Sequence, residues 1–552
     1  MTKITEEKIN QMLEREAEDL AKILSNKYGL PYLDASRITI DLDALKTVPE
    51  EEARKAGLAV FQASGKKLQV AILSPNKEET KNLLKKLEQN GYRLSVYMVS
   101  ETSLKRILKR YSEVPEFNEV KKGIVDVSPE KLSEFLKQAK KIEQLKEIFL
   151  GAISSQKSKR ISEFLEIILA GAIGLGASDI HLEPEEDVIR LRFRLDGVLH
   201  EVFSFEEKVY RLLLSRVKLV SGLKLNIHDR AQDGRFTINL KDSEIEIRVS
   251  VIPGAYGESI VARILDPQSI SVPLEELGME QYLYDILIKE IKKPNGMLLT
   301  TGPTGSGKTT TLYAFLKKIY SPNIKIITIE DPIEYHLEGI TQTQVEKKKG
   351  YTFANGLRAI LRQDPDVIMI GEIRDLETAK TAMNAALTGH LVFSTLHTNN
   401  AAGTIPRLID LGVNPNTIAP ALNASMAQRL VRRLCEKCKR EVKPDEREKE
   451  LLKKHLETLP EKFPKPNIDN VSIWKPAGCE ECNNIGYKGR IGIYEIILVD
   501  RKIESLILKS PSETQIWEAA KEQGIPNMQQ NGILKALKGI TSLEELQRIV
   551  EL

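Results

Sequence analysis

The apolar and polar positions of the first hundred residues predict a small α/β domain. Apolar residues recur at helical spacing over 5–27, which predicts an amphipathic helix, and Gly29 and Pro31 then end it. The residues after this helix predict a strand, a helix and a second strand over 68–73, 77–89 and 92–99. We therefore expect an N-terminal α/β domain over residues 1–112.

A second domain follows a charged segment. Residues 113–157 are rich in Lys and Glu, which predicts a linker with a solvated helix. An apolar helix begins near Ile161, and in residues 189–195 every second residue is apolar while the three between them are arginines. The same period of two returns at 236–240 and 245–251. We predict a half-buried antiparallel sheet in an α+β, PAS-like domain over 158–270.

The rest of the chain has the pattern of a parallel sheet. The segment DPQSISVPLEELG (266–278) is typical of a hinge, for which we take the bounds 271–284. Strands and helices then alternate over 285–552, as a parallel α/β sheet requires. The chain is thus predicted to be an α/β multidomain protein.

Composition and charge exclude several classes of protein. A chain of 552 residues predicts three or four domains at ~150 residues each. The 81 Lys and Arg against 78 Asp and Glu leave a net charge of only +3, so the concentrated basic excess of a nucleic-acid binder is missing. No apolar run approaches the ~18 residues of a membrane span, and the N-terminus lacks a signal peptide. We expect a cytoplasmic protein that binds no nucleic acid and reaches membranes only through partners.

A phosphate-binding loop stands between a predicted strand and a predicted helix. The short apolar strand Met297–Thr300 leads directly into a complete G-x-x-x-x-G-K-T motif. Glycines let backbone N–H groups turn toward a β-phosphate, and the helix N-terminus adds its dipole. We expect Lys308 to contact the β- and γ-phosphates of ATP and Thr309 to bind Mg²⁺, in a RecA-like ATPase domain. The residues predicted to hold the nucleotide are Gly302, Pro303, Thr304, Gly305, Ser306, Gly307, Lys308, Thr309 and Thr310.

A carboxylate at the end of a nearby strand is the candidate general base. The apolar strand Ile368–Ile370 ends in Gly371 and Glu372. P-loop enzymes place a magnesium-binding or water-activating acid at such strand ends. Most of them have Asp where this chain has Gly371, so the acid is one residue further on. We predict that Glu372 orients or deprotonates the attacking water. The alternative is a solvent-exposed carboxylate.

Two further groups of polar residues are candidates for the same site. Another strand, over 326–329, is followed by three acids: Glu330, Asp331 and Glu334. They suit a position around Mg²⁺ outside its direct ligands, and Glu330 is also a candidate catalytic residue. The alternative is that the three form an acid cluster at a helix N-cap. His390 and His397 flank the strand 391–393. One of them is a candidate γ-phosphate sensor, and the alternative is a buried, hydrogen-bonded histidine.

All four cysteines of the chain stand in two C-x-x-C pairs. The pairs are separated by 40 residues, mostly charged helix, and an insertion of this length can loop out because closure entropy grows slowly with loop length. Four such thiolates predict one tetrahedral Cys₄ zinc site, formed within a module over about 430–490. It leaves no open position for catalysis, and the alternative is a redox or disulfide pair. The predicted zinc ligands are Cys435, Cys438, Cys479 and Cys482.

With these motifs the chain resembles the secretion ATPases that drive type II secretion and type IV pilus assembly, the GspE and PilB group. The resemblance covers roughly residues 158–500. It is carried by SDIHLEP (178–184), IRLRFRLDGVL (189–199), QDGRF (232–236), GPTGSGKTT (302–310), ITIEDPIEY (327–335), FANGLRAILRQDPDVIMIGEIRDLETA (353–379), LTGHLVFSTLHTN (387–399), the Cys₄ module and GYKGRIGIYEI (486–496).

The resemblance implies a hexameric, ATP-hydrolysing motor with Mg²⁺ and Zn²⁺. It places the family's Walker A motif on 302–309, its Asp box on the acids after residue 329, its atypical Walker B motif on Glu372, and His390 and His397 in its His box. The second domain of one subunit would close over the ATPase domain and supply arginines to the nucleotide. By motif match these are Arg194, Arg216, Arg230 and Arg235, with the alternative that each lies on a solvated face.

The implied partners are an inner-membrane platform protein that adds pilins to a fibre, and a docking protein that binds the N-terminal domain. The protein would then lie at the cytoplasmic side of the inner membrane. The N-terminal region lacks the RLG motif with which some relatives bind cyclic di-GMP, so we do not expect that ligand. One alternative is a related motor for retraction or DNA uptake. The other is a nucleotide-gated scaffold with little turnover, which is suggested by Gly371 at the position where most P-loop enzymes have Asp.

Overall fold

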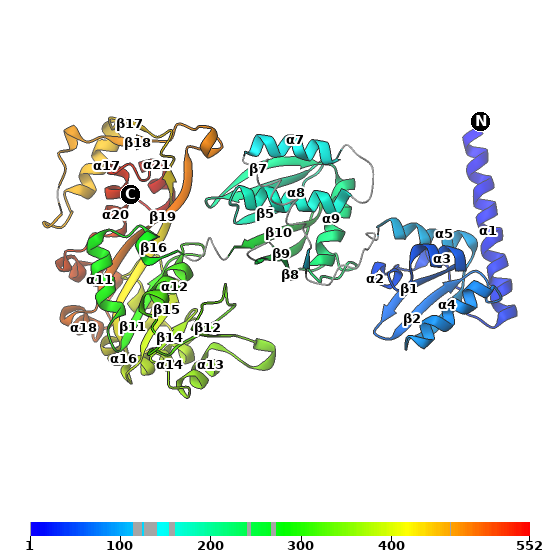
Figure 1. Cartoon of the computed structure of the whole chain (residues 1–552), viewed down its shortest axis with the longest axis horizontal. Coiled ribbons are helices and arrows are strands. Elements are labelled where there is room, and N and C mark those ends of the chain that lie inside the picture. The colour runs from blue at the N-terminus through cyan, green and yellow to red at the C-terminus, as the bar shows by residue number, and fades with distance from the viewer. Residues whose placement is uncertain are drawn as a thin grey trace. The chain divides into compact units, whose positions relative to one another are not determined.

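The computed structural model describes residues 2–113, 124–125, 141–153, 160–239, 244–266, 272–463 and 465–552. The chain divides into two compact units, Met1–Leu265 and Asp266–Leu552 (Figure 1). The α/β multidomain class predicted from the sequence is confirmed. In the part of the chain described, no helix combines the length and the apolar character needed to cross a bilayer.

The first unit begins with a three-stranded α/β module. Its sheet has the order β1-β2-β3, with β1 antiparallel and β3 parallel to β2. Helix α4 is the crossover between β2 and β3, and Leu83 and Leu87 of α4 are buried against the sheet. The elements are α1 (Thr2–Tyr28), α2 (Leu42–Leu45), α3 (Glu50–Ala56), β1 (Leu58–Ser64), β2 (Lys67–Ile72), α4 (Glu78–Gln89), β3 (Arg93–Met98) and α5 (Glu101–Lys109).

The second module of this unit is built on a seven-stranded sheet of order β4-β8-β9-β10-β5-β6-β7. Its strands are antiparallel except for the pair β4 and β8, and β6 alternates between buried apolar residues and arginines, as predicted. The elements are β4 (Ile124–Val125), α7 (Ile142–Ile153), α8 (Arg160–Gly174), β5 (Asp179–Pro184), β6 (Ile189–Leu195), β7 (Val198–Phe205), α9 (Glu207–Val220), β8 (Gln232–Asn239), β9 (Glu244–Gly254) and β10 (Gly257–Leu265).

Within 113–157, where we predict a linker with a solvated helix, the described helix α7 packs against the second module. Helix α7 lies in this stretch, and its Leu145 and Phe149 are fully buried. The Phe149 ring packs against Phe164 of α8 and Phe203 of β7. Charged residues of α7 lie between these apolar positions. The overall composition of the segment therefore does not reveal that one face of the helix is apolar. Most of the remaining predicted linker lies outside the described residues.

The second unit has a mainly parallel sheet, of order β13-β12-β14-β15-β11-β16-β19, in which only β19 is antiparallel to its neighbour. Alternate residues of β11 face two separate cores. Helices α11 and α12 pack on one side, and α13, α14 and α16 pack on the other. Its first elements are α11 (Gln281–Ile291), β11 (Gly296–Thr301), α12 (Lys308–Ile319), β12 (Ile326–Glu330), β13 (Thr341–Gln344), α13 (Phe353–Leu361), β14 (Val367–Ile370), α14 (Leu376–Leu387) and β15 (Leu391–Leu396).

The remaining elements of this unit close the sheet and carry the cysteines. Within the charged insertion between the C-x-x-C pairs, β17 pairs with β18, and Leu452 and Leu456 of α17 enter the main core. The elements are α15 (Thr404–Asp410), α16 (Pro415–Ala421), β16 (Leu422–Leu434), β17 (Arg440–Val442), α17 (Glu446–Leu456), β18 (Ile473–Lys475), β19 (Tyr487–Leu498), α18 (Arg501–Ile507), α19 (Glu513–Ala520), α20 (Met528–Leu537) and α21 (Leu543–Ile549).

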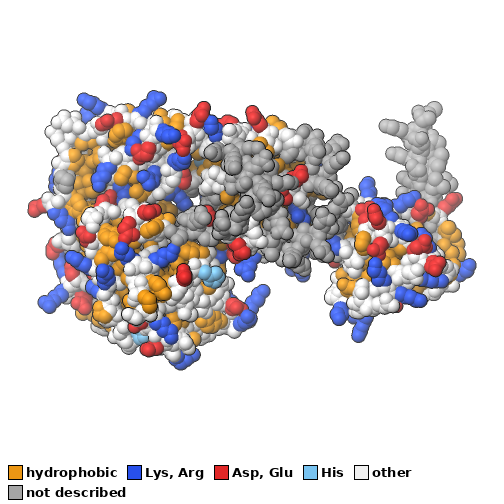
Figure 2. All heavy atoms as spheres, viewed as in Figure 1, with side chains coloured by type: hydrophobic (Ala, Val, Ile, Leu, Met, Phe, Trp, Pro, Cys, Tyr) orange, Lys and Arg blue, Asp and Glu red, His pale blue; other side chains and the backbone are white. Residues whose placement is uncertain are grey.

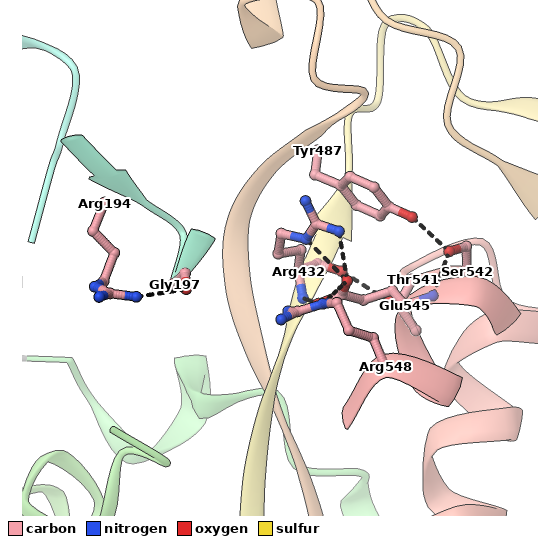
Figure 3. Close-up of polar contacts among 8 residues, drawn as sticks. All are labelled: Arg194, Gly197, Arg432, Tyr487, Thr541, Ser542, Glu545 and Arg548. Atoms are coloured by element: carbon pink, nitrogen blue, oxygen red, sulfur yellow. Dashed lines mark hydrogen bonds and ion pairs between the residues drawn. The ribbon is translucent and has the colours of Figure 1, made fainter. Parts of the chain in front are cut away.

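A buried ion cluster attaches the C-terminal helix α21 to strand β16 (Figure 3). The carboxylate of Glu545, which is 1% exposed, accepts hydrogen bonds from the guanidinium groups of Arg432 and Arg548. The Arg432 guanidinium also lies 4.1 Å from the centre of the Tyr487 ring. Burial alone would raise the pKa of Glu545, but the two arginines outweigh burial and lower it.

Replacing Arg432 with Met is expected to destabilise the second unit by about 3 kcal/mol, because it leaves a buried carboxylate with one partner fewer. The measurement is chemical unfolding at neutral pH, compared with Arg433→Met, which changes an exposed residue of the same strand. Because the Glu545 pKa is lowered on folding, its contribution is present above the ordinary carboxyl pKa of about 4.3 and is lost as pH falls below that value. Equal stability of the two variants would contradict this role for Arg432.

Candidate nucleotide and metal sites

The phosphate-binding loop lies between β11 and α12, in the middle of the sheet. Gly302 has φ +148°, and a Cβ built on it would lie 2.6 Å from the Gln428 carbonyl oxygen and 2.6 Å from Ser306 Oγ. Gly307, with φ +88°, is the N-cap residue immediately before α12. The Gln428 side-chain amide donates to the Ser306 carbonyl oxygen at 2.8 Å. The loop therefore needs glycines at these positions, and β16 supports it from the side.

Lys308 is the first residue of α12, and its side chain turns back over the loop. Its Nζ donates to the carbonyl oxygens of Gly302 (2.8 Å) and Pro303 (3.0 Å). Burial lowers the pKa of Lys308 to about 8, while Glu372 raises it and Arg429 lowers it further. The ammonium group is thus still charged at neutral pH. Thr309 and Thr310 follow it in the first turn of the helix.

Strand register brings Glu372 and His397 to the edge of the sheet where this loop lies. Thr301 pairs with Leu396, so His397 follows beside the loop, and Ile370 pairs with Ser394, so Glu372 comes to the same edge. Glu372 Oε2 lies 3.4 Å from His397 Nε2. Glu372 Oε1 lies 2.5 Å from a guanidinium nitrogen of Arg374, a residue that the sequence analysis did not single out. Arg374 stands two residues after Glu372 in the sequence, and this short spacing was the feature from which their pairing could have been predicted.

The three acids after β12 differ in accessibility. Glu330 is 2% exposed, and its carboxylate accepts hydrogen bonds from the hydroxyls of Tyr313 and Thr328 and from the Gln342 amide. Burial raises the pKa of Glu330, and these donors oppose the rise. Asp331 lies 3.4 Å from the Lys347 ammonium group, and Glu334 is half-buried. No helix begins between residues 331 and 340, all of which are described, so the N-cap alternative for these acids does not apply.

His390 does not reach the phosphate-binding edge, contrary to its prediction as a nucleotide-binding residue. It precedes β15, at the end of the strand opposite His397. The Gly296 N–H donates to the His390 carbonyl oxygen, and His390 Nδ1 bonds with the Ala385 carbonyl at 3.0 Å. A strand of six residues separates the two histidines. The geometry fits the alternative of a hydrogen-bonded structural histidine.

Two of the predicted arginines belong to a row that crosses the sheet of the first unit. Direct cross-strand pairing joins Arg235 to Arg248, Arg248 to Arg263, Arg263 to Asp179, and Asp179 to Arg194. We call the four arginines of this set the arginine row. Directly paired residues lie on one face of a sheet, and like charges that face each other destabilise it. Arg248 and Arg263 did not appear among the sequence candidates.

Few carboxylates balance the arginine row. Asp179 lies 3.2 Å from Arg194 Nε and 3.0 Å from Arg263 Nε, and Glu246 lies beside Arg248 and Arg235. Arg194 also donates to the Gly197 carbonyl oxygen (Figure 3). Arg194 and Arg263 thus flank the buried Asp179, Arg235 and Arg248 lie beside Glu246, and the row presents four guanidinium groups on one face of the sheet, an arrangement suited to an anionic ligand.

The other two predicted arginines lie outside the row. Arg216 is on α9, and burial lowers the pKa of its guanidinium. Its Nε is buried without a hydrogen-bond partner among the described residues. Arg230 is exposed, in the loop between α9 and β8. Figure 2 shows positive and negative side chains interspersed over the visible face of the second unit, in keeping with the near-zero net charge.

The four cysteine sulfurs converge on one point. All four Sγ atoms lie within 4.8 Å of one another. The Cys435–Cys479 and Cys438–Cys482 Sγ distances are 3.8 Å, and the Cys479–Cys482 distance is 3.7 Å. Zn–S bonds of about 2.3 Å in a tetrahedron place sulfurs about 3.8 Å apart. The donor set and its spacing therefore fit a structural zinc ion, and the thiols are not joined as disulfides.

Backbone groups complete the cysteine site. The N–H groups of Cys479 and Gly486 point at Cys482 Sγ, at 3.2 and 3.1 Å. Such hydrogen bonds stabilise thiolate ligands of a metal. Tyr487, the next residue, begins β19 and contacts Arg432, so the cysteine site is linked to the ion cluster of α21.

Comparison with known proteins identifies relatives of nearly the whole chain. A family model described as Type II/IV secretion system protein matches residues 154–548, and one described as MshEN domain matches residues 28–117. Type II secretion system protein E of Aeromonas hydrophila is 46% identical over 389 residues, which cover 70% of this chain and 75% of that protein. Type IV pilus assembly ATPase PilB of Pseudomonas aeruginosa is 37% identical over 533 residues, which cover 96% and 90%.

A solved structure shares the fold. The ATPase DotB of Legionella pneumophila superposes with a TM-score of 0.50 over 70% of this chain and 95% of its own, at 22% identity. At this identity the likeness concerns the fold alone.

Proposed function

Because the chain belongs to the Type II/IV secretion system protein family, we propose that it is a hexameric motor that assembles type IV pili or type II secretion pseudopili through an inner-membrane platform protein. Its enzymatic activity is ATP hydrolysis, as in its secretion and pilus assembly relatives. The observation that carries the proposal is the convergence of Lys308, Glu372 and His397 at one edge of the sheet, beside a complete phosphate-binding loop.

This geometry supports the following hydrolytic step. Backbone N–H groups of residues 302–309 and the Lys308 ammonium bind the phosphates of ATP. Glu372 takes a proton from water as the water oxygen bonds to the γ-phosphorus and the bond from that phosphorus to the β–γ bridging oxygen breaks, releasing ADP and phosphate. Arg374 and His397 hold the Glu372 carboxylate toward the site.

The acids after β12 have separate roles in this proposal. The Thr309 hydroxyl, Asp331 and Glu334 would hold Mg²⁺, which when bound neutralises the charge of the phosphates. In the structure Asp331 forms an ion pair with Lys347, and this pair must break before Asp331 can bind Mg²⁺. Glu330 is surrounded by three donors, so we assign it a positioning role in the strand end rather than proton transfer.

The arginine row is the proposed source of positive charge supplied by a neighbouring subunit. Arg194 and Arg235 are among the predicted arginines, and Arg248 and Arg263 extend the set. Guanidinium groups stabilise the charge that develops on a transferring phosphoryl group. For Arg216 and Arg230, which lie outside the row, the same role remains a proposal from motif match alone.

The remaining parts of the proposal concern zinc and partners. Cys435, Cys438, Cys479 and Cys482 would bind one structural Zn²⁺. The N-terminal domain would bind a docking protein at the cytoplasmic face of the inner membrane. The absence of cyclic di-GMP binding stays a prediction.

Mixed oligomers test the proposal that an arginine acts across subunits. Lys308→Ala and Arg194→Ala proteins should each hydrolyse little ATP. A reassembled 1:1 mixture should recover activity at about a quarter of its sites, because a heterologous ring interface then pairs an intact Lys308 with an intact Arg194 at that frequency. The measurement is steady-state turnover of the size-fractionated oligomer.

Arg211→Ala provides the control for this experiment, because Arg211 is an exposed arginine of the same unit that pairs only with Glu207 in the described structure. It should be fully active alone and in mixtures. Failure of the Lys308→Ala and Arg194→Ala mixture to recover activity, with subunit exchange verified by a label, would rule out a role for Arg194 in trans.

A further inference from the structure

Arg429 lies beside the first glycine of the phosphate-binding loop. Strand β16 runs parallel to β11, with Thr301 paired to Ala427, so Gln428 and Arg429 extend along the loop. A Cβ built on Gly302 would lie only 3.1 Å from Arg429 Nη1. The guanidinium group therefore lies close to the loop, although the phosphate-binding motif does not include this residue.

The Arg429 guanidinium donates to backbone carbonyl oxygens, and it forms no ion pair with a carboxylate of the described residues. Its Nη2 donates to the Asn399 carbonyl oxygen at 2.7 Å, and its Nη1 donates to the Gln428 carbonyl oxygen at 3.3 Å. Among the ion pairs of the described residues, none within 4.0 Å involves Arg429 or Lys308. Lys308 likewise donates to carbonyl oxygens, those of Gly302 and Pro303. Two cations thus flank Gly302, and both are held by backbone carbonyls.

The acid that acts on Arg429 is in no position to neutralise it. Glu495 is the carboxylate that raises the Arg429 pKa, whereas burial lowers it. Both oxygens of Glu495 accept backbone N–H groups, from Ala401 and Met528, and burial raises its pKa to about 7. Both oxygens of this carboxylate are therefore engaged by backbone donors rather than by the Arg429 guanidinium.

We infer that Arg429 is a nucleotide-binding residue whose guanidinium contacts a phosphate oxygen of the nucleotide held by Lys308 in the same subunit. The inference rests on the proposed function and adds to it a second cation supplied in cis. A polyanion beside Gly302 would pair with both cations at once, and a guanidinium forms strong charge-assisted hydrogen bonds with phosphate. The alternative is a structural role, because the Arg429 guanidinium donates a hydrogen bond to the Asn399 carbonyl oxygen and so holds the backbone two residues beyond His397.

Charge-preserving and charge-removing variants distinguish the two roles. We expect Arg429→Gln to weaken the binding of fluorescent ADP and ATP about 10–100-fold, because a charge-assisted hydrogen bond is lost. Arg429→Lys keeps the charge and should bind at least several-fold more tightly than the Gln variant. Arg433→Ala, which removes an exposed arginine four residues along the same strand, should bind like the wild type. Equilibrium titration of the purified full-length oligomer at two salt concentrations gives the dissociation constants.

Each outcome decides between the alternatives. Wild-type affinity in Arg429→Gln would overturn the inference. Equal weakening in the Gln and Lys variants, with the same salt dependence as the wild type, would assign Arg429 to the structural role at Asn399 and would also overturn it. A wild-type protein that binds no nucleotide would overturn the proposed function itself, and the inference with it.

Discussion

Replacing Glu372 with Gln is expected to slow ATP hydrolysis about 10²–10⁴-fold while nucleotide binding is retained, because a general base typically contributes this factor. Gln has nearly the same size as Glu and accepts a hydrogen bond from Arg374, but it does not take up a proton. The loop and Lys308, which bind the phosphates in our proposal, contact backbone carbonyls rather than Glu372. Binding and turnover should therefore separate.

The measurement is steady-state turnover of the size-fractionated oligomer together with nucleotide affinity. Glu377→Gln is the matched control, because Glu377 is an exposed acid five residues further on and pairs with Arg358. Its turnover should equal that of the wild type. Equal rates for Glu372→Gln and the wild type would favour either a nucleotide-gated scaffold or another base. Glu334 would then be the stronger candidate, since both oxygens of the buried Glu330 carboxylate already accept hydrogen bonds from protein groups.

Local sequence patterns predicted the elements that carry the chemistry. The phosphate-binding motif specifies its own strand, loop and helix, so its fold could be read directly from the sequence. Parallel strands place all their carboxyl ends at one edge. An acid that closely follows an apolar strand, as Glu372 does, can therefore be placed at the same edge as Lys308 without knowledge of the strand order.

The register of the strands and their order in the sheets could not be predicted from the sequence. His390 and His397 flank one predicted strand, which already implies opposite edges of the sheet, so only the residue after the strand, His397, was to be expected beside the phosphate-binding loop. The alternation in 189–195 placed Arg194 on a polar face, but only the pairing of β5, β8, β9 and β10 aligns Arg248 and Arg263 with it. Arg429 was missed for a related reason, since its proximity to Gly302 depends on the pairing of β16 with β11.

Removal of a zinc ligand is expected to have the largest effect on stability. We expect about one zinc per chain in the purified wild type, and loss of most of it in Cys482→Ser. Structural zinc contributes roughly 10–16 kcal/mol in zinc-finger peptides, where nothing else holds the site together. Here β17, β18 and the buried side chains of α17 hold part of the module, so only a portion of that free energy should be lost.

Elemental analysis and thermal unfolding, each with and without a chelator, measure the two effects. Ala477→Ser is the matched control, because it introduces the same hydroxyl at an exposed position close to Cys479. This variant should keep its zinc. Full zinc in Cys482→Ser would refute the Cys₄ site, and a disulfide in the native protein would favour the redox alternative.

The consequences of zinc loss should extend to the nucleotide. Cys482 Sγ accepts the N–H of Gly486, Tyr487 follows, and its ring packs on the Arg432 guanidinium at the end of β16. Arg429 is three residues earlier on that strand, close to the phosphate-binding loop. Zinc removal should therefore weaken ADP binding as well as lower the unfolding temperature. An apo protein that unfolds earlier but binds ADP with unchanged affinity would show that the Cys₄ module stabilises the fold without supporting the loop.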